Sequence, residues 1–180
     1  MEISDDKIKS LALKNGYDFA ILKAIIAVES GGIGFAADTG KIIIQFEPSW
    51  FKKKSPYTPS RLWSVNGVER QSKEWAAFNN AFSLDPVAAM ESTSIGMMQV
   101  MGFHWKELGF TSVGEMWDYA KTGIEAQVSL AIRFIQSNSK LDKALKDHNF
   151  EKIAFYYNGK DYRRFGYEKK LFTAFKKYSG

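Results

Sequence analysis

The chain contains no cysteine and only two histidines, His104 and His148, among its 180 residues. Without thiols it can form neither disulfides nor thiolate metal sites. The two histidines stand alone without the spacing of a ligand set, so a metal site could use them only together with carboxylates. We therefore expect no metal ion and no other cofactor.

Long apolar segments are also missing. No part of the sequence approaches the roughly 20 apolar residues that a membrane-spanning helix needs. The N-terminal segment MEISDDKIKS is acidic and polar, unlike a secretory signal peptide. We expect a soluble protein that is made in the cytoplasm without a signal peptide and does not insert stably into membranes. These absences do not fix where the protein acts.

A modest excess of positive charge is present. The chain has 25 lysines and arginines against 20 acidic residues, which gives a formal net charge of +5. Such a balance favours anionic partners, namely nucleic acid, acidic lipid or bacterial wall polymers. Many basic residues gather in residues 50–56 and 162–180, where solvated helix faces are the simpler interpretation. Because we find no nucleic-acid recognition motif, we expect no nucleic acid as a partner.

The length of the chain predicts a single domain over residues 1–180. A chain of this length buries one sizeable core but is too short for two comfortable domains. No internal repeat, low-complexity stretch or linker interrupts it. The pattern of elements predicts about nine helices and one small sheet, and hence one α-rich α+β domain.

Capping residues and apolar periodicity indicate where the helices lie. Ser4, followed by acidic residues, starts a first helix that Asn15-Gly16 ends. A second helix runs from Asp18 to Glu29, and apolar residues cover almost all its faces, so we expect it to be the central, buried helix. Residues 55–68 resemble a surface loop. Further helices are predicted over residues 48–54, 68–85, 85–90, 94–110, 112–123, 123–138, 149–159 and 167–179.

Two apolar segments receive different predictions. Residues 41–47, KIIIQFE, are β-branched and aromatic and predict a strand. The overlapping DTGK predicts the turn of a small hairpin. Residues 94–110, which contain four closely spaced apolar side chains, predict a buried helical segment; these are Met97, Met98, Val100 and Met101.

Glu29 ends the most apolar helix of the chain. A carboxylate at a helix C-terminus is disfavoured by the helix dipole, and burial disfavours its charged form further. Both effects would keep a proton on the acid, and an acid that cleaves a glycosidic bond must protonate the leaving oxygen. The alternative is a side chain that reaches water or pairs with a lysine. Gly31 and Gly32 would turn the chain sharply after it, at least one of them with positive φ.

A second carboxylate has two candidates, Asp38 and Glu47. Carboxyl groups lie about 6.5–9.5 Å apart in inverting glycosidases and about 5–5.5 Å apart in retaining ones. The sequence gives no distances and does not choose between these outcomes. Asp38 could instead form a turn through its side chain. Glu47 could instead accept a hydrogen bond from the start of the helix at Pro48.

Polar residues in two later segments are candidate binding groups. Gln99 lies among methionines, and a buried glutamine needs partners that sugar hydroxyl and acetamido groups could supply. Tyr156 and Tyr157, before Asn158-Gly159, could offer a phenol to the acid and a ring to a sugar. The alternatives are a core glutamine bound to backbone, packing for the tyrosines, and a plain turn for Asn158-Gly159.

Four stretches occur in this order along the chain: AVESGGIGF, KIIIQFEPSWF, STSIGMMQVMGFHW and YYNGKDYRRFGYEKKL. Together they resemble the N-acetylmuramidase family of phage endolysins, within the lysozyme superfamily, over nearly the whole chain. Goose-type lysozymes and lytic transglycosylases share a shorter pattern: a Glu-Ser that ends a buried helix, a later G-x-M-Q segment and a YN near the end. A long insertion from Asp38 to Met90 departs from the transglycosylase pattern and suits the muramidase family better.

The resemblance implies a fold and roles for individual residues. The fold would be lysozyme-like, predominantly α-helical with a small β-hairpin or sheet. Glu29 would be the catalytic acid, and Glu47 would lie beside the cleft. Four further positions match cleft residues that contact substrate: Ser94, Gln99, Tyr157 and Asn158.

The implied activity is hydrolysis of the β-1,4 bond between N-acetylmuramic acid and N-acetylglucosamine in peptidoglycan. Glu29 would be the general acid, and Asp38 or Glu47 would position water or stabilise an oxocarbenium-like transition state. The near alternative is a lytic transglycosylase that uses Glu29 alone. The alternative from another class is a non-catalytic wall-binding or nucleic-acid-binding α-domain. We expect a monomer that acts on the bacterial cell wall; host range and stereochemical outcome stay open.

Overall fold

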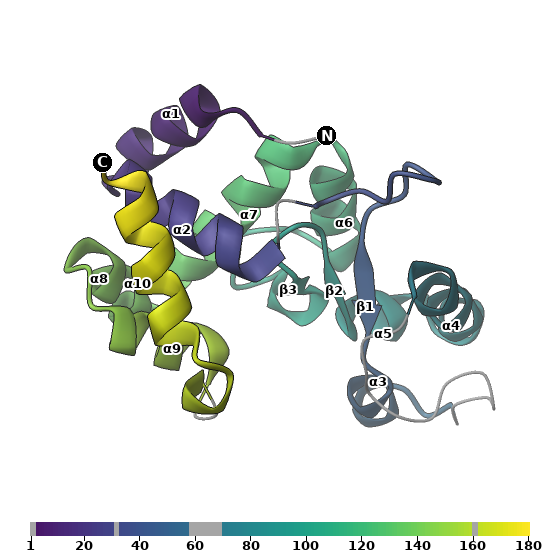
Figure 1. The fold of residues 1–180 in the computed structure, drawn as a ribbon. Helices are drawn as coiled ribbons and strands as arrows, with labels where there is room; N and C mark the ends of the chain where they lie inside the picture. The colour runs from purple at the N-terminus through teal and green to yellow at the C-terminus, as the bar shows by residue number, and fades with distance from the viewer. Residues whose placement is uncertain (1–2, 31–32, 58–69, 160–161) are drawn as a thin grey trace.

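The computed structural model describes residues 3–30, 33–57, 70–159 and 162–180 (Figure 1). It is predominantly helical with a small antiparallel sheet, as the sequence predicts. In Figure 1 the helices α8 to α10 lie to the left, and the strand β1 with α3 to α5 lies to the right. The turn expected at Gly31 and Gly32, and most of the loop expected at 55–68, fall outside the described residues.

Two capped helices begin the chain. In α1 (Asp5–Asn15), the Lys7 amide donates to Ser4 Oγ over 3.4 Å, and Gly16 ends the helix in a left-handed conformation with φ +72°. In α2 (Phe19–Ser30), the residues between Ala20 and Ile26 are buried apart from Lys23. The C-terminal helix α10 (Tyr167–Tyr178) packs along α2, as Figure 1 shows. The expected central position of α2 is confirmed.

The sheet has three short antiparallel strands in the order β1-β2-β3. They are β1 (Ile44–Phe46), β2 (Thr93–Ile95) and β3 (Val100–Met101), with Ile44 opposite Ile95 and Phe46 opposite Thr93. The expected turn exists, with Gly40 at φ +64°. The hairpin around it is reduced to one isolated bridge between Phe35 and Ile42. The main partner of β1 is β2, a strand far later in the chain.

The prediction of a helical segment over residues 94–110 is wrong. This segment forms β2, a tight turn, β3 and the short 3-10 helix η1 (Gly102–His104). Gly96 at φ +72° and Gln99 at φ +50° reverse the chain between the strands, and left-handed residues interrupt a right-handed helix. A Cβ atom at Gly102 would lie 2.0 Å from the Met90 carbonyl oxygen, so the close approach of these two segments requires glycine there.

Side chains of α4 satisfy the outer edge of β1. The strand β1 is followed by two helices, α3 (Pro48–Lys54) and α4 (Gln71–Leu84). The Ile44 amide donates to Gln71 Oε1 over 3.0 Å, Gln71 Nε2 donates to the Ile44 carbonyl over 2.8 Å, and the Phe46 amide donates to Glu74 Oε2 over 2.8 Å. Residues three apart share a helix face, so both side chains reach the strand. The otherwise open edge of the sheet is thereby closed.

Five helices and a 3-10 segment complete the fold beside α10. They are α5 (Pro86–Glu91), α6 (Val113–Lys121), α7 (Ile124–Ser137), α8 (Ser139–Lys146), α9 (Phe150–Asn158) and η2 (Tyr162–Phe165). The expected cap of α5 is present, because the Ala88 amide donates to Asp85 Oδ1 over 3.0 Å. None of the helices in the described ranges combines the length and the apolar character needed to cross a membrane.

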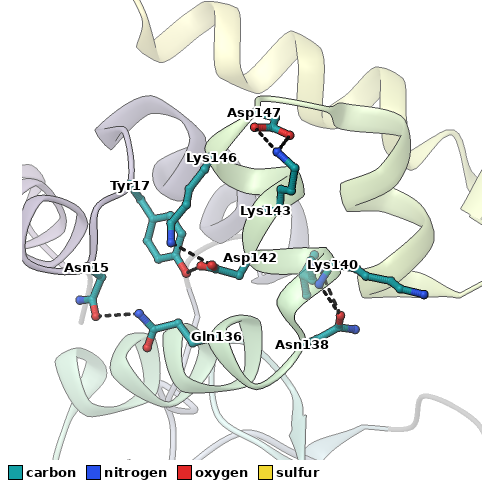
Figure 2. A network of polar contacts seen from close by, with 10 residues as sticks. Asn15, Tyr17, Gln136, Asn138, Lys140, Asp142, Lys143, Lys146 and Asp147 are labelled. Carbon is teal, nitrogen blue, oxygen red and sulfur yellow. Dashed lines mark hydrogen bonds and ion pairs between the residues drawn. The ribbon is translucent and has the colours of Figure 1, made fainter.

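The helix α8 was not expected from the sequence. Asn138 caps it by accepting hydrogen bonds from the amides of Lys140 and Leu141 over 3.1 and 3.2 Å. Figure 2 shows how α8 is tied to the start of the chain. The Tyr17 hydroxyl donates to Asp142 Oδ1 over 2.6 Å, and Lys146 Nζ donates to Asp142 Oδ2 over 2.8 Å. This network fixes the connection between α1 and α2 against α8.

Candidate functional site

Glu29 lies in the last turn of α2 and is half-buried. Two tyrosines, Tyr157 on α9 and Tyr167 on α10, face it closely enough to sense its charge. Burial, and then the negative charge of Glu29, raise the pKa of Tyr157 well above its usual value. The same two causes, in the same order, raise the pKa of Tyr167. The acid at the end of α2 is therefore lined by phenols from the two helices that close the fold.

The Tyr157 hydroxyl is a buried polar group near Glu29. It is buried and finds no hydrogen-bond partner among the described residues. Buried polar groups are nearly always hydrogen-bonded, and an unsatisfied one is destabilising. A phenol beside an acid, with an unused donor, suits a substrate that brings its own oxygen atoms.

Glu47 lies between β1 and α3 and is also half-buried. Its amide donates to the Ser92 carbonyl over 2.9 Å, which continues the pairing of the sheet. Gln45 Nε2 donates to Glu47 Oε1 over 2.7 Å. Burial raises the pKa of Glu47, the hydrogen bond from Gln45 lowers it, and the charge of Glu74 raises it; the net direction is upward.

The alternative in which the Glu47 side chain caps α3 is wrong. Its side chain makes no capping hydrogen bond. The backbone carbonyl of Glu47 serves this purpose, because it accepts from the amides of Trp50 and Phe51 over 3.0 and 3.2 Å. The carboxyl group of Glu47 is thus held by Gln45 and is not used to start the helix.

Asp38 lies in a different environment from the two glutamates. It is exposed, in the turn that precedes β1. With Lys41 and with Gln71, Trp75 and other residues of α4 it lines a hollow of about 330 Å³. The side-chain hydrogen bond in the turn comes from Thr39, whose Oγ1 accepts from the Lys41 amide over 3.4 Å. The neighbours of Asp38 thus come from α4, whereas those of Glu29 come from α9 and α10.

Ser94 and Gln99 are brought together by the turn between β2 and β3. Ser94 Oγ donates to Gln99 Oε1 over 2.7 Å, and Gln99 Nε2 donates to the Gly96 carbonyl over 2.8 Å. One of the two contacts of Gln99 is thus to backbone, as in the alternative of a glutamine bound to backbone, and the other is to the Ser94 hydroxyl. Asn158 is the last residue of α9, and its side chain is outside what the structure describes.

Gln127 is a buried polar residue that the sequence analysis did not single out. Its side chain is 1% exposed, on the inner face of α7. Gln127 Oε1 accepts from the Met97 amide over 2.7 Å, and Nε2 donates to the Ala120 carbonyl over 3.2 Å. A Cβ atom at Gly34 would lie 2.2 Å from Gln127 Oε1, and one at Gly96 would lie 2.8 Å from its Cδ. Gln127 thus supports both the segment that follows Glu29 and the turn that carries Gln99.

The sequence does contain a signal for Gln127. It is a lone amide in the apolar stripe of an amphipathic helix, where a polar side chain must find partners. Glu74 is comparable, since it is only 4% exposed and accepts from the Phe46 amide. Both side chains accept hydrogen bonds from backbone amides in segments far away in the sequence.

A continuous row of rings connects the surroundings of Glu47 with those of Glu29. Neighbouring centroids lie 4.7, 4.5, 5.0 and 5.8 Å apart along the row, which consists of Trp50, Phe103, His104, Phe134 and Tyr157. It starts on α3, one helical turn after Glu47, and passes through η1 and α7. It ends on α9 at the tyrosine that senses the charge of Glu29. We call it the aromatic row.

No group of three potential metal-ligating side chains occurs among the described residues. His104 instead contacts Glu107, with 2.8 Å between Nδ1 and Oε2. The arrangement offers two half-buried carboxylates, a buried phenol and a partly exposed wall of rings. These are the groups that acid–base chemistry on a sugar chain requires.

The chain resembles known proteins in sequence and in structure. The sequence model of the N-acetylmuramidase family matches residues 18–179. The crystal structure of the Burkholderia AP3 phage endolysin superposes with a TM-score of 0.88 at 30% sequence identity, over 99% of this chain and 71% of that one. No protein with a curated description matches the chain. The resemblance drawn from the four sequence stretches is confirmed.

Proposed function

We propose that this chain, which belongs to the N-acetylmuramidase family, is a peptidoglycan hydrolase that cleaves the β-1,4 bond between N-acetylmuramic acid and N-acetylglucosamine. The observation that carries the proposal is the aromatic row, which leads from the neighbourhood of one half-buried acid to that of the other. The substrate is the bacterial cell wall, and the catalytic groups belong to the protein alone.

Glu29 is the general acid in this proposal. It gives its proton to the oxygen that leaves with N-acetylglucosamine, while the bond between that oxygen and C1 of N-acetylmuramic acid breaks. A water molecule forms the new bond to C1 and loses one proton to the second carboxylate. The products are a reducing N-acetylmuramic acid end and a free hydroxyl on N-acetylglucosamine. Proton exchange with solvent then restores both carboxyl groups.

Glu47 is the better candidate for the second carboxylate. Burial and the charge of Glu74 raise its pKa, and a more basic carboxylate accepts a proton from water more readily. The hydrogen bond from Gln45 and the backbone pairing of the strand fix its position, as a catalytic group requires. Asp38 is instead exposed in a turn.

Substitution of Glu29 tests the proposal most directly. Glu29→Gln keeps the shape of the side chain but has no proton of suitable acidity, so lysis should fall about 10²–10⁴-fold. Turbidity loss of outer-membrane-permeabilised Gram-negative cells measures the activity, and circular dichroism establishes that the variant is folded. Asp38→Asn is the matched control and should retain most activity. Near-parental lysis by a folded Glu29→Gln variant would contradict the assignment of the acid.

Product analysis separates hydrolysis from the two rival activities. A lytic transglycosylase, with Glu29 as its only acid and base, gives an anhydro end that is lighter than the hydrolysed end by one water. Mass spectrometry of a digest distinguishes the two. A non-catalytic wall-binding domain would bind the cells and leave their turbidity unchanged.

A further inference from the structure

We propose that Trp50, Phe103 and Lys53 form an outer subsite that binds a peptide-bearing segment of the glycan strand, at the Glu47 end of the aromatic row. We call these three residues the outer platform. The inference rests on the proposed function, because it takes peptidoglycan as the ligand. Its role is to hold the strand, and it takes no part in breaking the bond.

The two rings of the platform lie together at the surface. The Trp50 and Phe103 centroids are 4.7 Å apart with an interplanar angle of 43°. Trp50 is 37% exposed, whereas most large apolar side chains of the protein are buried. Its amide donates to the Glu47 carbonyl over 3.0 Å, so the platform begins one helical turn from that acid. The partly exposed ring of Trp50, three residues after Glu47 in the chain, can therefore be contacted by a ligand together with Phe103.

Two lysines lie over these rings, and their partners differ. Lys54 Nζ is 5.6 Å from the Phe103 centroid and 2.9 Å from Glu91 Oε2, so a carboxylate already holds it. Lys53 is exposed, and its Nζ lies 4.6 Å from the Trp50 centroid. Within the described ranges, Lys53 contacts this ring and no carboxylate. Lys53 is therefore the cation available to an anionic ligand.

Peptidoglycan has the chemistry that such a platform recognises. Its sugars present C–H faces that pack against aromatic rings, and its stem peptides carry carboxylates. An exposed ammonium–ring contact is weak, so Lys53 can leave the ring and pair with a carboxylate as a sugar approaches Trp50. A charge-assisted hydrogen bond then replaces the ring contact. An apolar ligand or a neutral polysaccharide would use the rings only.

The position of the platform predicts which kinetic constant it controls. The aromatic row connects it to Tyr157, and α3 and α9 lie on opposite sides of the view in Figure 1. A strand that contacts both ends of the row therefore lies across the two acids. Interactions at the outer end are the same before and during bond cleavage, so they affect KM and leave kcat nearly unchanged.

The test measures strand binding separately from cleavage. Soluble, uncross-linked peptidoglycan strands that carry their stem peptides are compared with chitin strands of N-acetylglucosamine, which have the same β-1,4 linkage and no carboxylate. Calorimetry in the Glu29→Gln background gives Kd for each strand. The variants are Trp50→Ala, Trp50→Phe as the ring-retaining control, and Lys53→Gln. Phe172→Ala and Lys140→Gln, at exposed positions on α10 and α8, are the matched remote controls.

We expect Trp50→Ala to weaken the binding of both strands about tenfold, as for an aromatic residue that contributes strongly to an interface. Trp50→Phe should recover most of this loss. Lys53→Gln should weaken binding of the peptide-bearing strand about threefold, in the range of an exposed ion pair, and leave binding of the uncharged chitin strand unaffected. In the Glu29 parent, the same substitutions should raise KM and preserve kcat.

The subsite is overturned if folded Trp50→Ala binds both strands as the background protein does. The role of Lys53 is overturned if Lys53→Gln affects the two strands equally. If Trp50→Ala does not fold, Lys53→Glu in the same assay decides, because charge reversal should affect only the peptide-bearing strand. Failure of the proposed function is distinguishable: Glu29→Gln would still cleave the strands, whatever Trp50→Ala does to Kd.

Discussion

Two partly covered carboxylates, Asp142 and Glu47, are held in opposite ways. Burial pushes the pKa of Asp142 upward, but hydrogen bonds from Lys146 and Tyr17 and the charge of Lys146 outweigh it, so the pKa is lowered. Figure 2 shows Asp142 between these two partners. At Glu47 burial also acts upward, Gln45 offers only a neutral hydrogen bond, and Glu74 adds a second negative charge, so the pKa is raised.

The two carboxylates differ in how their negative charge is stabilised. Asp142 has a cation and a phenol, which stabilise its charge and tie α8 to the α1–α2 connection. At Glu47 the hydrogen bond from Gln45 stabilises the charge, but burial and the charge of Glu74 outweigh it. A raised pKa means that the charged form of Glu47 opposes folding, and acids perturbed by burial and by a like charge occur often at functional sites. Asp142 therefore contributes to stability, whereas the environment of Glu47 suits the catalytic role proposed for it.

The largest expected effect is the contrast in activity between the two neutral variants. Glu47→Gln removes the proton acceptor of the proposed mechanism, and lysis should fall about 10²–10⁴-fold. Asp142→Asn, the same chemical change in the other environment, should keep nearly parental activity at temperatures where it is folded. Initial rates of turbidity loss measure both. Equal losses in the two variants, or a larger loss in Asp38→Asn, would remove Glu47 from the second role.

The stability of the fold, in contrast to the activity, should depend on Asp142 and its partners. Tyr17→Phe removes a hydrogen bond to a carboxylate and should cost about 1 kcal/mol, or a few degrees in Tm. Because the pKa of Asp142 is lowered on folding, its stabilising contribution is present above the unfolded pKa and is lost as the pH falls through the folded value. Thermal unfolding at several pH values measures this loss.

Glu47→Gln should instead raise Tm at neutral pH. The folded pKa of Glu47 is raised, so its charged form opposes folding above that pKa. The gain should shrink as the pH falls through the folded pKa and vanish below the unfolded one. A destabilised Glu47→Gln protein at neutral pH would show that the carboxylate supports the fold.

Locally determined features of the fold could be predicted from the sequence. Ser4 and Gly16 cap α1, and Asp85 caps α5, because each contact lies within a few residues of the cap. The failure at residues 94–110 has the opposite cause. The methionines there suit a helix, but pairing with β1, a strand about 50 residues earlier in the chain, decides the structure.

The residues of the candidate site show the same contrast between features set by local sequence and features set by long-range contacts. Glu29 and Glu47 stand out because each ends an apolar element, which is visible in the sequence. Gln127 and Glu74 do not stand out, because their partners, Met97 and Phe46, lie in other elements. The order of rings in the aromatic row likewise depends on how α3, η1, α7 and α9 pack. Tertiary contacts therefore determine which candidates meet.

The smallest expected effect is a shift in the pH dependence of activity when the neighbours of Glu47 are changed. If ionised Glu47 is the active form, activity is lost as the pH falls through its pKa, and this pKa sets the acid limb of kcat/KM. Gln45→Leu removes the hydrogen bond that lowers the pKa, so the limb should move to higher pH. Glu74→Gln removes the charge that raises it and can keep the bond to the Phe46 amide, so the limb should move to lower pH.

Gln136→Leu, the same substitution as at Gln45 but in the network of Figure 2, should leave the limb at its parental pH. Shifts in opposite directions cannot arise from a general loss of stability, which would change the rate without moving the limb in a charge-dependent sense. If both variants keep the parental limb, another group sets it and Glu47 is not the base.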